Sequence, residues 1–285
     1  MYYPERSLIA LFRQAMPVYI KHLRLLGIIT LIAFLPMLIL NIFIPNDYAT
    51  AFIYVIENFQ AFSAEQISIE DLTTALNTAV VSGFQMFVFL VIGIELLFMP
   101  IATAGATLIV RNSLTSTDSN FDNTASAALS GFLKAAVTTI LALIAPIFVL
   151  MMIPNAAMLM GFLIIFAVYM VTLIVFYQNI VADTGRWGFV ATHVSRQMAR
   201  GRFFRVFLKA AAIFIAYFIH FWLLEAFAQI TGINTAHIAI RLIYSLAARF
   251  MLMFYFIVFA CWYFDIKIRN KELFASISPN KNNDK

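Results

Sequence analysis

The sequence predicts an all-α, polytopic membrane protein with about six transmembrane helices and with amphipathic helices at the cytoplasmic interface. Three observations support this fold class. The chain of 285 residues is 63% hydrophobic but only 12% charged, whereas a soluble globular domain carries roughly twice that charged fraction. Apolar runs long enough to cross the hydrocarbon core recur along the chain. The basic residues gather in alternate connections between these runs, as the positive-inside rule describes.

The first 24 residues are expected to form a helix that lies in the headgroup layer. Their apolar side chains recur at spacings of three and four residues, which places them on one helical face. Pro17 is expected to bend this helix. Residues 25–44 form the first apolar run. Because this run is longer than the apolar core of a signal peptide, we predict an uncleaved transmembrane span.

An acidic connection follows the first span. Residues 45–78 contain five acidic side chains and no Lys or Arg. The spacing of Ser68 and Asp71 predicts the start of a short helix, as does the pair Ser63 and Gln66. The chain then enters the membrane again.

The second span is predicted at residues 79–110, where Pro100 permits a kink. A polar segment rich in Asn, Ser and Asp then predicts a loop. The remaining predicted spans are residues 132–153, 156–182, 207–230 and 237–264. Residues 1–270 are expected to form one membrane domain, and residues 271–285 a polar tail.

The distribution of basic residues predicts the orientation of the chain. With six spans, seventeen of the nineteen Lys and Arg residues lie on the side of both chain ends. Arg241 lies on the opposite side, and Arg249 lies within a span. Because cytoplasmic flanks are enriched in Lys and Arg, both termini are predicted to be cytoplasmic. The net charge of +5 is therefore attributed to topology, and no nucleic-acid partner is expected.

Ionisable residues within predicted spans are candidate functional residues, because their burial in lipid is costly. Glu95, His220 and Arg249 are expected at similar depths, about 24 Å from the cytoplasmic edge at about 1.5 Å per residue. One interpretation is a polar cluster that lines a substrate or proton path. The other is a buried ion pair that joins two spans. Glu225 and Arg241 are expected to meet near the outer surface.

A basic stretch between the fourth and fifth spans is the candidate contact with anionic lipid headgroups. It holds six basic residues and no acid, interleaved with apolar side chains that can enter the interface. Topology alone also explains these charges, and the two interpretations are compatible. The candidate contacts are Arg186, Arg196, Arg200, Arg202, Arg205 and Lys209.

No catalytic, cofactor-binding or metal-binding motif is expected from the sequence. The four histidines are scattered without metal-ligand spacing, and the signatures of zinc proteases, serine hydrolases and phosphate-binding loops are missing. A single cysteine, Cys261, excludes an intramolecular disulfide. Near the end of the sixth span, Asp265 and Arg269 have the spacing of a favourable helical ion pair, next to Tyr263.

Three stretches of the chain resemble a known family. They are residues 58–66 (NFQAFSAEQ), the basic segment Ser195-Arg196-Gln197, and the ending from Trp262 to Arg269 (WYFDIKIR). With these stretches the chain resembles the YciC family of Gram-negative inner-membrane proteins. More distantly, it is similar to the membrane domain associated with some bacterial glycerophosphodiester phosphodiesterases. The resemblance covers most of the chain and implies an inner-membrane location, but it implies no reaction and no catalytic residues.

The expected function is that of a non-enzymatic inner-membrane protein that supports envelope or lipid organisation, with anionic lipids as partners on the cytoplasmic side. The alternative is a transporter of small solutes or lipids, or a subunit of a transport complex, that uses the cluster of Glu95, His220 and Arg249. An intramembrane enzyme is a weaker alternative. A water-filled cavity at the level of the cluster favours transport, and a dry centre filled by side chains favours a structural role.

Overall fold

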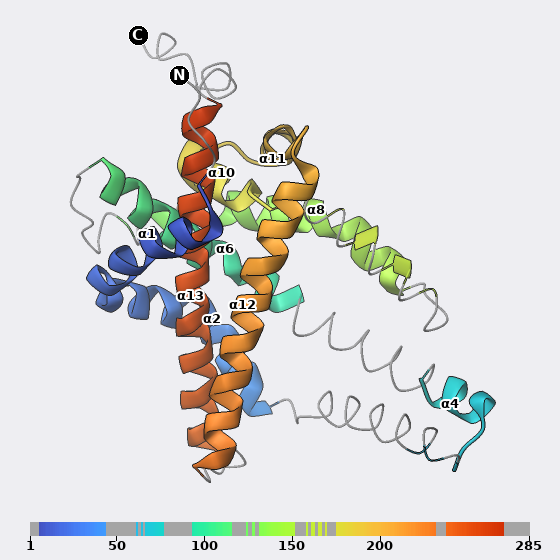
Figure 1. Cartoon of the computed structure of the whole chain (residues 1–285). Helices are drawn as coiled ribbons and strands as arrows, with labels where there is room; N and C mark the ends of the chain where they lie inside the picture. The colour runs from blue at the N-terminus through green and yellow to red at the C-terminus, as the bar shows by residue number, and fades with distance from the viewer. Residues whose placement is uncertain are drawn as a thin grey trace.

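The computed structural model describes residues 6–43, 61, 64, 66–76, 93–115, 124, 127–128, 131–151, 158, 161–162, 165–166, 169, 175–231 and 238–270. In these parts of the chain every regular element is an α-helix. Figure 1 shows α13 (Ile238–Arg269) running through the middle of the molecule, with α12 (Phe203–Ile230) beside it in the opposite direction. The all-α fold class is therefore confirmed.

Two of the described helices are long and apolar enough to cross a membrane. They contain the apolar segments Phe203–Leu224 and Leu242–Arg269. The helices α1 (Leu8–Lys21) and α2 (Leu23–Phe43) meet the same criteria together, although they are bent by 89°. Two or three membrane-crossing helices thus fit the described part of the chain, and the number six stays a prediction.

The bend between α1 and α2 lies at His22, and α1 continues without a break through Pro17. Ser7 begins α1, since its side-chain oxygen accepts a hydrogen bond from the N–H of Ala10 at 3.2 Å. At the other end, the N–H of His22 still donates to the last carbonyls of α1. The expected bend at Pro17 was therefore placed five residues too early.

The helix α6 (Gly93–Leu114) packs against α2 and α13, and it also passes through a proline, Pro100. Its middle is made of small residues, and every residue from Ile101 to Val110 is buried. A Cβ atom on Gly105 would lie only 2.8 Å from the side chain of Ile29 on α2. The small residues of α6 therefore allow two helices to approach closely, as in membrane helix pairs generally.

The predicted fourth span does not continue as one helix to residue 182. A turn at Val175 and Phe176 precedes the short helix α10 (Tyr177–Thr184). The Phe176 ring is fully buried, with its edge against Trp262 at 4.8 Å between ring centroids. Its N–H donates to Ser195 Oγ at 3.2 Å. These contacts fix the turn, which the apolar pattern alone does not reveal.

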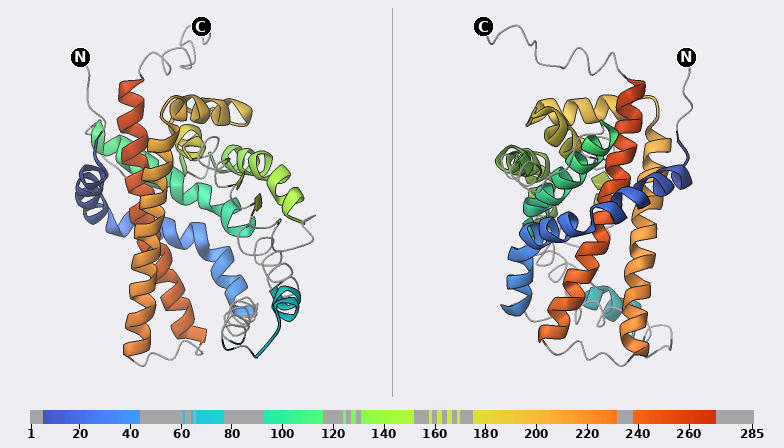
Figure 2. Two further views of the ribbon diagram at one scale, coloured as in Figure 1. Left: turned by 45° about the vertical axis from the view of Figure 1, so that its right-hand side comes forward. Right: turned by 90° about the vertical axis from the view of Figure 1, so that its left-hand side faces the viewer.

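The helix α11 (Phe189–Ala199) lies crosswise at the end of the molecule where α13 finishes (Figure 2). Gly185 and Gly188 precede it with φ values of 69° and 66°, a left-handed conformation that glycine adopts without strain. The basic stretch of the sequence therefore forms two elements, α11 and the first turns of α12.

Two further helices agree with the predicted elements. The helix α8 (Phe132–Met151) matches the third predicted span. The short helix α4 (Ile69–Leu76) begins at the predicted capping pair. Ser68 Oγ accepts from the N–H of Asp71 at 3.1 Å, and the Asp71 carboxylate accepts from the N–H of Ser68 at 3.2 Å. Hydrogen bonds from Ser68 also hold the pKa of the Asp71 carboxyl below its usual range. Ser63 lies outside the described residues.

The last two predicted spans correspond to α12 and α13, with different ends. The helix α12 starts four residues earlier than predicted, at Phe203, and α13 continues five residues beyond Phe264 to Arg269. The additional turn of α13 carries Asp265 and Arg269, which are bonded to each other along the helix. Electrostatic pairing therefore extends the helix past the end of its apolar run.

Candidate functional site

A buried polar seam joins α10 to α6. Thr103 Oγ1 on α6 donates to Gln178 Oε1 on α10 at 2.7 Å. One helical turn away, Asn179 Nδ2 donates to Thr107 Oγ1 at 2.9 Å. The four side chains are each at most 9% exposed. Because a buried polar group is costly unless it is hydrogen-bonded, these matched pairs allow a polar helix to lie among apolar ones.

The same seam continues from α10 to α8. Gln178 Nε2 donates to Tyr177 Oη at 2.9 Å, and Tyr177 Oη is bonded to Thr139 Oγ1 on α8 at 2.7 Å. The neighbouring Thr138 Oγ1 accepts from the N–H of Gly188 at 2.7 Å, which anchors the start of α11. Between α6, α8 and α10, the described polar side chains therefore form hydrogen bonds with one another. This arrangement is typical of a structural network.

Two buried carboxylates, one on α10 and one on α13, form ion pairs with basic side chains of the last turns of α13. Asp183 of α10, whose side chain is 4% exposed, forms an ion pair with Lys267. It also accepts a hydrogen bond from Tyr263 Oη at 2.8 Å. The Tyr263 ring is fully buried. The end of α13 is thereby held to α10 by one ion pair and one hydrogen bond from a tyrosine to the same carboxylate.

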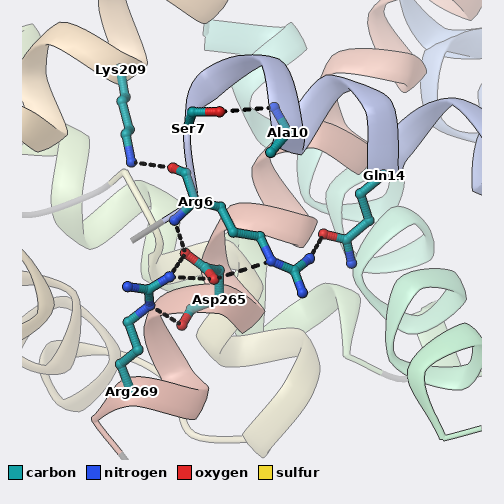
Figure 3. A network of polar contacts seen from close by, with 7 residues as sticks. All are labelled: Arg6, Ser7, Ala10, Gln14, Lys209, Asp265 and Arg269. Atoms are coloured by element: carbon teal, nitrogen blue, oxygen red, sulfur yellow. Dashed lines mark hydrogen bonds and ion pairs between the residues drawn. The ribbon is translucent and has the colours of Figure 1, made fainter. Parts of the chain in front are cut away.

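Asp265 is the second of these carboxylates (Figure 3). Arg269 donates to both of its oxygens, at 2.8 and 2.9 Å. The N–H of Arg6 donates to Asp265 Oδ2 at 3.3 Å, and the Arg6 guanidinium lies 3.6 Å from Oδ1. Lys209 of α12 donates to the Arg6 carbonyl at 2.9 Å. This network joins the starts of α1 and α12 to the end of α13.

The two predicted neighbours His220 and Arg249 have different surroundings. His220 is exposed on α12, where its Nδ1 atom is bonded to the hydroxyl of Tyr255. Arg249 is half-buried on α13, with its guanidinium 5.7 Å from the ring centre of Phe34. Glu95 lies in the first turn of α6, and its side chain is outside the described part of the structure. The pair of Glu95 and Arg249 therefore stays a prediction.

The predicted outer pair, Glu225 and Arg241, is placed only at the level of the backbone. Glu225 lies near the end of α12 and Arg241 near the start of α13. These two helix ends lie at the same end of the hairpin in all views (Figures 1 and 2). The two side chains are outside the described part of the structure, so their contact is also still a prediction.

The six predicted lipid contacts fall into two groups by their exposure. Arg196, Arg200 and Arg205 are exposed, whereas Arg186 and Arg202 are half-buried. Lys209 is also half-buried: its ammonium donates to the Arg6 carbonyl and lies 5.8 Å from the ring centre of Trp262. The structure therefore gives Lys209 a role in the Asp265 network that the sequence did not suggest.

The exposed side of α11 carries basic and aromatic side chains together. Arg196 of α11 and Arg200, the residue directly after the helix, are both exposed, and Phe189, on the same side as Arg196, is 76% exposed. Phe204, at the start of α12, is also 76% exposed. The opposite side of α11 is buried through Val194, Ser195 and Met198. We call Phe189, Arg196 and Arg200 the α11 face.

A shallow hollow of about 390 Å3 lies on the outer side of α1. Its lining combines two arginines with short polar and apolar side chains. The lining residues are Arg6, Ser7, Ile9, Ala10, Arg13 and Gln14. The hollow is open and lies away from the buried seam. Among the described residues, no three His, Cys, Asp or Glu side chains lie close enough to hold a metal ion.

The sequence interpretation missed the threonines of the buried seam and the role of Arg6. Thr103 and Thr107 stand four residues apart within a run of Ala and Gly, the residues that permit close helix packing. Two threonines four residues apart among such small residues indicate a polar contact between closely packed helices. Arg6 gave no such signal, because its partner Asp265 is 259 residues away in the chain.

Comparison of the chain with protein-family models, with curated proteins and with solved structures finds no match.

Proposed function

We propose that the chain is a multi-pass protein of the bacterial inner membrane that binds anionic phospholipids on its cytoplasmic side and supports envelope or lipid organisation without catalysing a reaction. The observation that carries this proposal is the α11 face, where Arg196 and Arg200 are exposed beside Phe189. Cations attract anionic headgroups, while an aromatic side chain enters the interface.

The position of the α11 face supports this proposal. The helix lies crosswise at the end where α12 starts and α13 finishes (Figure 2). That end carries the basic residues of the last turn of α13, Lys267 and Arg269. The positive-inside rule supports a cytoplasmic location for this end, and with it for both termini. The resemblance to the YciC family is consistent with this location.

The buried seam and the paired carboxylates support a non-enzymatic, structural role. Each described carboxylate at the end of α13 is already bound to a cation. A general acid or base needs a titratable group within reach of a substrate, and these two side chains are at most 8% exposed. The polar groups at this end therefore fix helices in place.

The proposal is tested by extracting the protein from the membrane in polymer-bounded nanodiscs and measuring the phospholipids that surround it by mass spectrometry. We expect phosphatidylglycerol and cardiolipin to be enriched relative to phosphatidylethanolamine. The double variant Arg196→Gln/Arg200→Gln should lose this enrichment, by up to about fivefold per charge removed, since each surface cation contributes about 1 kcal/mol.

The matched control is Arg13→Gln/Lys21→Gln, which removes two exposed charges from α1. It lowers the net charge by the same amount but leaves α11 intact. If both double variants lose the enrichment equally, overall charge is responsible and the α11 face is not a binding surface. If the unchanged protein shows no enrichment, the lipid-binding function itself is refuted.

A further inference from the structure

A histidine lies on an exposed side of α12, within the apolar segment Phe203–Leu224 that is long enough to cross a membrane. His220 is exposed and is the eighteenth residue of α12. At about 1.5 Å per residue it lies about 25 Å from Phe203 and about 15 Å from Ile230. In a bilayer that α12 crosses, His220 is therefore surrounded by hydrocarbon. An ionisable side chain at such a depth marks a functional site by default.

The hydrogen bonds of His220 define which atom is available to a ligand. Its Nδ1 atom lies 2.8 Å from the carbonyl oxygen of Ala216 and is also bonded to the Tyr255 hydroxyl. The Tyr255 hydroxyl itself donates to the same carbonyl at 3.0 Å. Since a carbonyl only accepts, we assign the proton of the imidazole to Nδ1. The Nε2 atom then carries a lone pair, and it has no partner among the described residues.

Aromatic rings surround the anchored side of this histidine. The centroid of the Tyr255 ring lies 5.8 Å from that of His220, 5.5 Å from that of Tyr217 and 6.1 Å from that of Phe12. Along the exposed side of α12, Phe227 is 59% exposed two helical turns further on. The imidazole thus borders an aromatic cluster, and the exposed side of α12 offers an apolar surface for a hydrocarbon tail.

We propose that His220 and Tyr255 form an intramembrane binding site for a lipid-soluble phenol or quinol. The ligand hydroxyl donates to Nε2 of His220, its ring contacts the aromatic cluster, and its tail lies along α12. The chemical class follows from the three observations: a hydrogen-bond acceptor, a hydrocarbon surrounding and neighbouring aromatic rings. Tyr255 acts as a positioning residue, because it holds the imidazole and does not itself contact the ligand hydroxyl.

The test uses the full-length protein in phosphatidylcholine nanodiscs and a photoreactive derivative of para-decylphenol as the probe. Labelled peptides from α12 and α13 are quantified by mass spectrometry. Unlabelled para-decylphenol and its methyl ether compete for the site; they share ring and tail and differ in the hydroxyl donor. We expect the phenol to compete about tenfold better than the ether, the factor that one hydrogen bond of typical strength provides.

His220→Leu should reduce saturable labelling by about the same factor. His220→Gln, which keeps an acceptor oxygen, should retain part of it, and His193→Leu on α11 serves as the matched control that leaves it unchanged. Equal competition by phenol and ether overturns the proposal, as does labelling that His220→Leu leaves unaltered. Whether a second copy of the chain covers His220 is tested with His220→Cys in a Cys261→Ala background. Efficient disulfide formation between two copies also overturns it, because the partner copy then covers His220.

Discussion

The two halves of α13 differ in what surrounds them, although both are apolar. From Met253 to Ile266 nearly every side chain is buried, against α1, α2, α6 and α10. From Leu242 to Ala247 the side chains are half-buried or exposed, and Ile243 is 69% exposed. The helix α12 shows the same contrast, since Ile213 is fully buried and Trp222 is 78% exposed.

The contrast shows that hydrophobicity alone does not determine which part of a membrane helix forms protein core. In lipid, apolar side chains gain little from helix contact, so packing and polar contacts decide where helices associate. In α13 the buried half is the half that carries Trp262, Tyr263 and Asp265, with their aromatic and ionic partners. The exposed half has the composition of a lipid-facing surface.

Substitution of one buried tryptophan on α13 and one exposed tryptophan on α12 tests this contrast most strongly. Trp262→Ala removes a fully buried ring that contacts Phe176 and Phe259. We expect it to lower the free energy of unfolding by about 3–5 kcal/mol, as for other large aromatic residues in cores. Trp222→Ala, its matched control, should change it by less than about 1 kcal/mol, because the exposed ring contacts lipid in both states.

The measurement is equilibrium unfolding by dodecyl sulfate in mixed micelles, followed by far-ultraviolet circular dichroism. Similar losses for the two tryptophans would contradict the division of the hairpin into a core half and a lipid-facing half.

Substitution of Asp183 tests whether its ion pair with Lys267 stabilises the buried half of α13. Asp183→Asn keeps an acceptor for Tyr263 but leaves the Lys267 ammonium without its counter-charge. We expect a loss of about 2–3 kcal/mol, which is below the range for fully buried pairs because Lys267 is 30% exposed. Asp183→Asn/Lys267→Gln should cost less than the sum of the two single variants.

Arg6→Gln provides the comparison within the same region. The Arg6 side chain is 48% exposed and its guanidinium lies 3.6 Å from Asp265, so its removal should cost about 0.2–1 kcal/mol. An equal cost for Arg6→Gln and Asp183→Asn in the same unfolding assay would show that burial does not govern these pairs.

Periodicity and length predicted most of the described helices, because an apolar run of about twenty residues has few other solutions in lipid. The capping pair of Ser68 and Asp71 also predicted α4 correctly. The break at Phe176 was missed, since it depends on contacts with Trp262 and Ser195 that are distant in sequence. The distribution of charges indicated the basic end of the molecule, but not that Lys209 binds the Arg6 carbonyl.

The surroundings of the ionisable residues were likewise not predictable from the sequence. The sequence placed His220 at the depth of Arg249, and both lie in apolar helices as expected. Depth follows from residue number along a helix, but direction follows from how the helices rotate against their neighbours. The contacts of His220 with Tyr255 and of Arg249 with Phe34 are therefore properties of packing, which one sequence does not determine.

Substitutions of two glycines compare how closely α2 packs against α6 and against α13. A Cβ on Gly105 would meet the Ile29 side chain at 2.8 and 3.0 Å, whereas a Cβ on Gly27 would lie 3.8 Å from Phe250. Gly105→Ala forces Ile29 to move, at a cost of about 1–3 kcal/mol. The better helix propensity of Ala offsets about 1 kcal/mol of that cost.

We therefore expect Gly105→Ala to destabilise by about 1 kcal/mol and Gly27→Ala to stabilise by up to about 1 kcal/mol. Both glycines lie where α2 packs, so the opposite signs would locate the closest helix approach at the α2–α6 contact and the looser one at α2–α13. If both substitutions change the free energy of unfolding in the same direction, Ile29 relaxes freely and the contact between α2 and α6 is less tightly packed than the distances indicate.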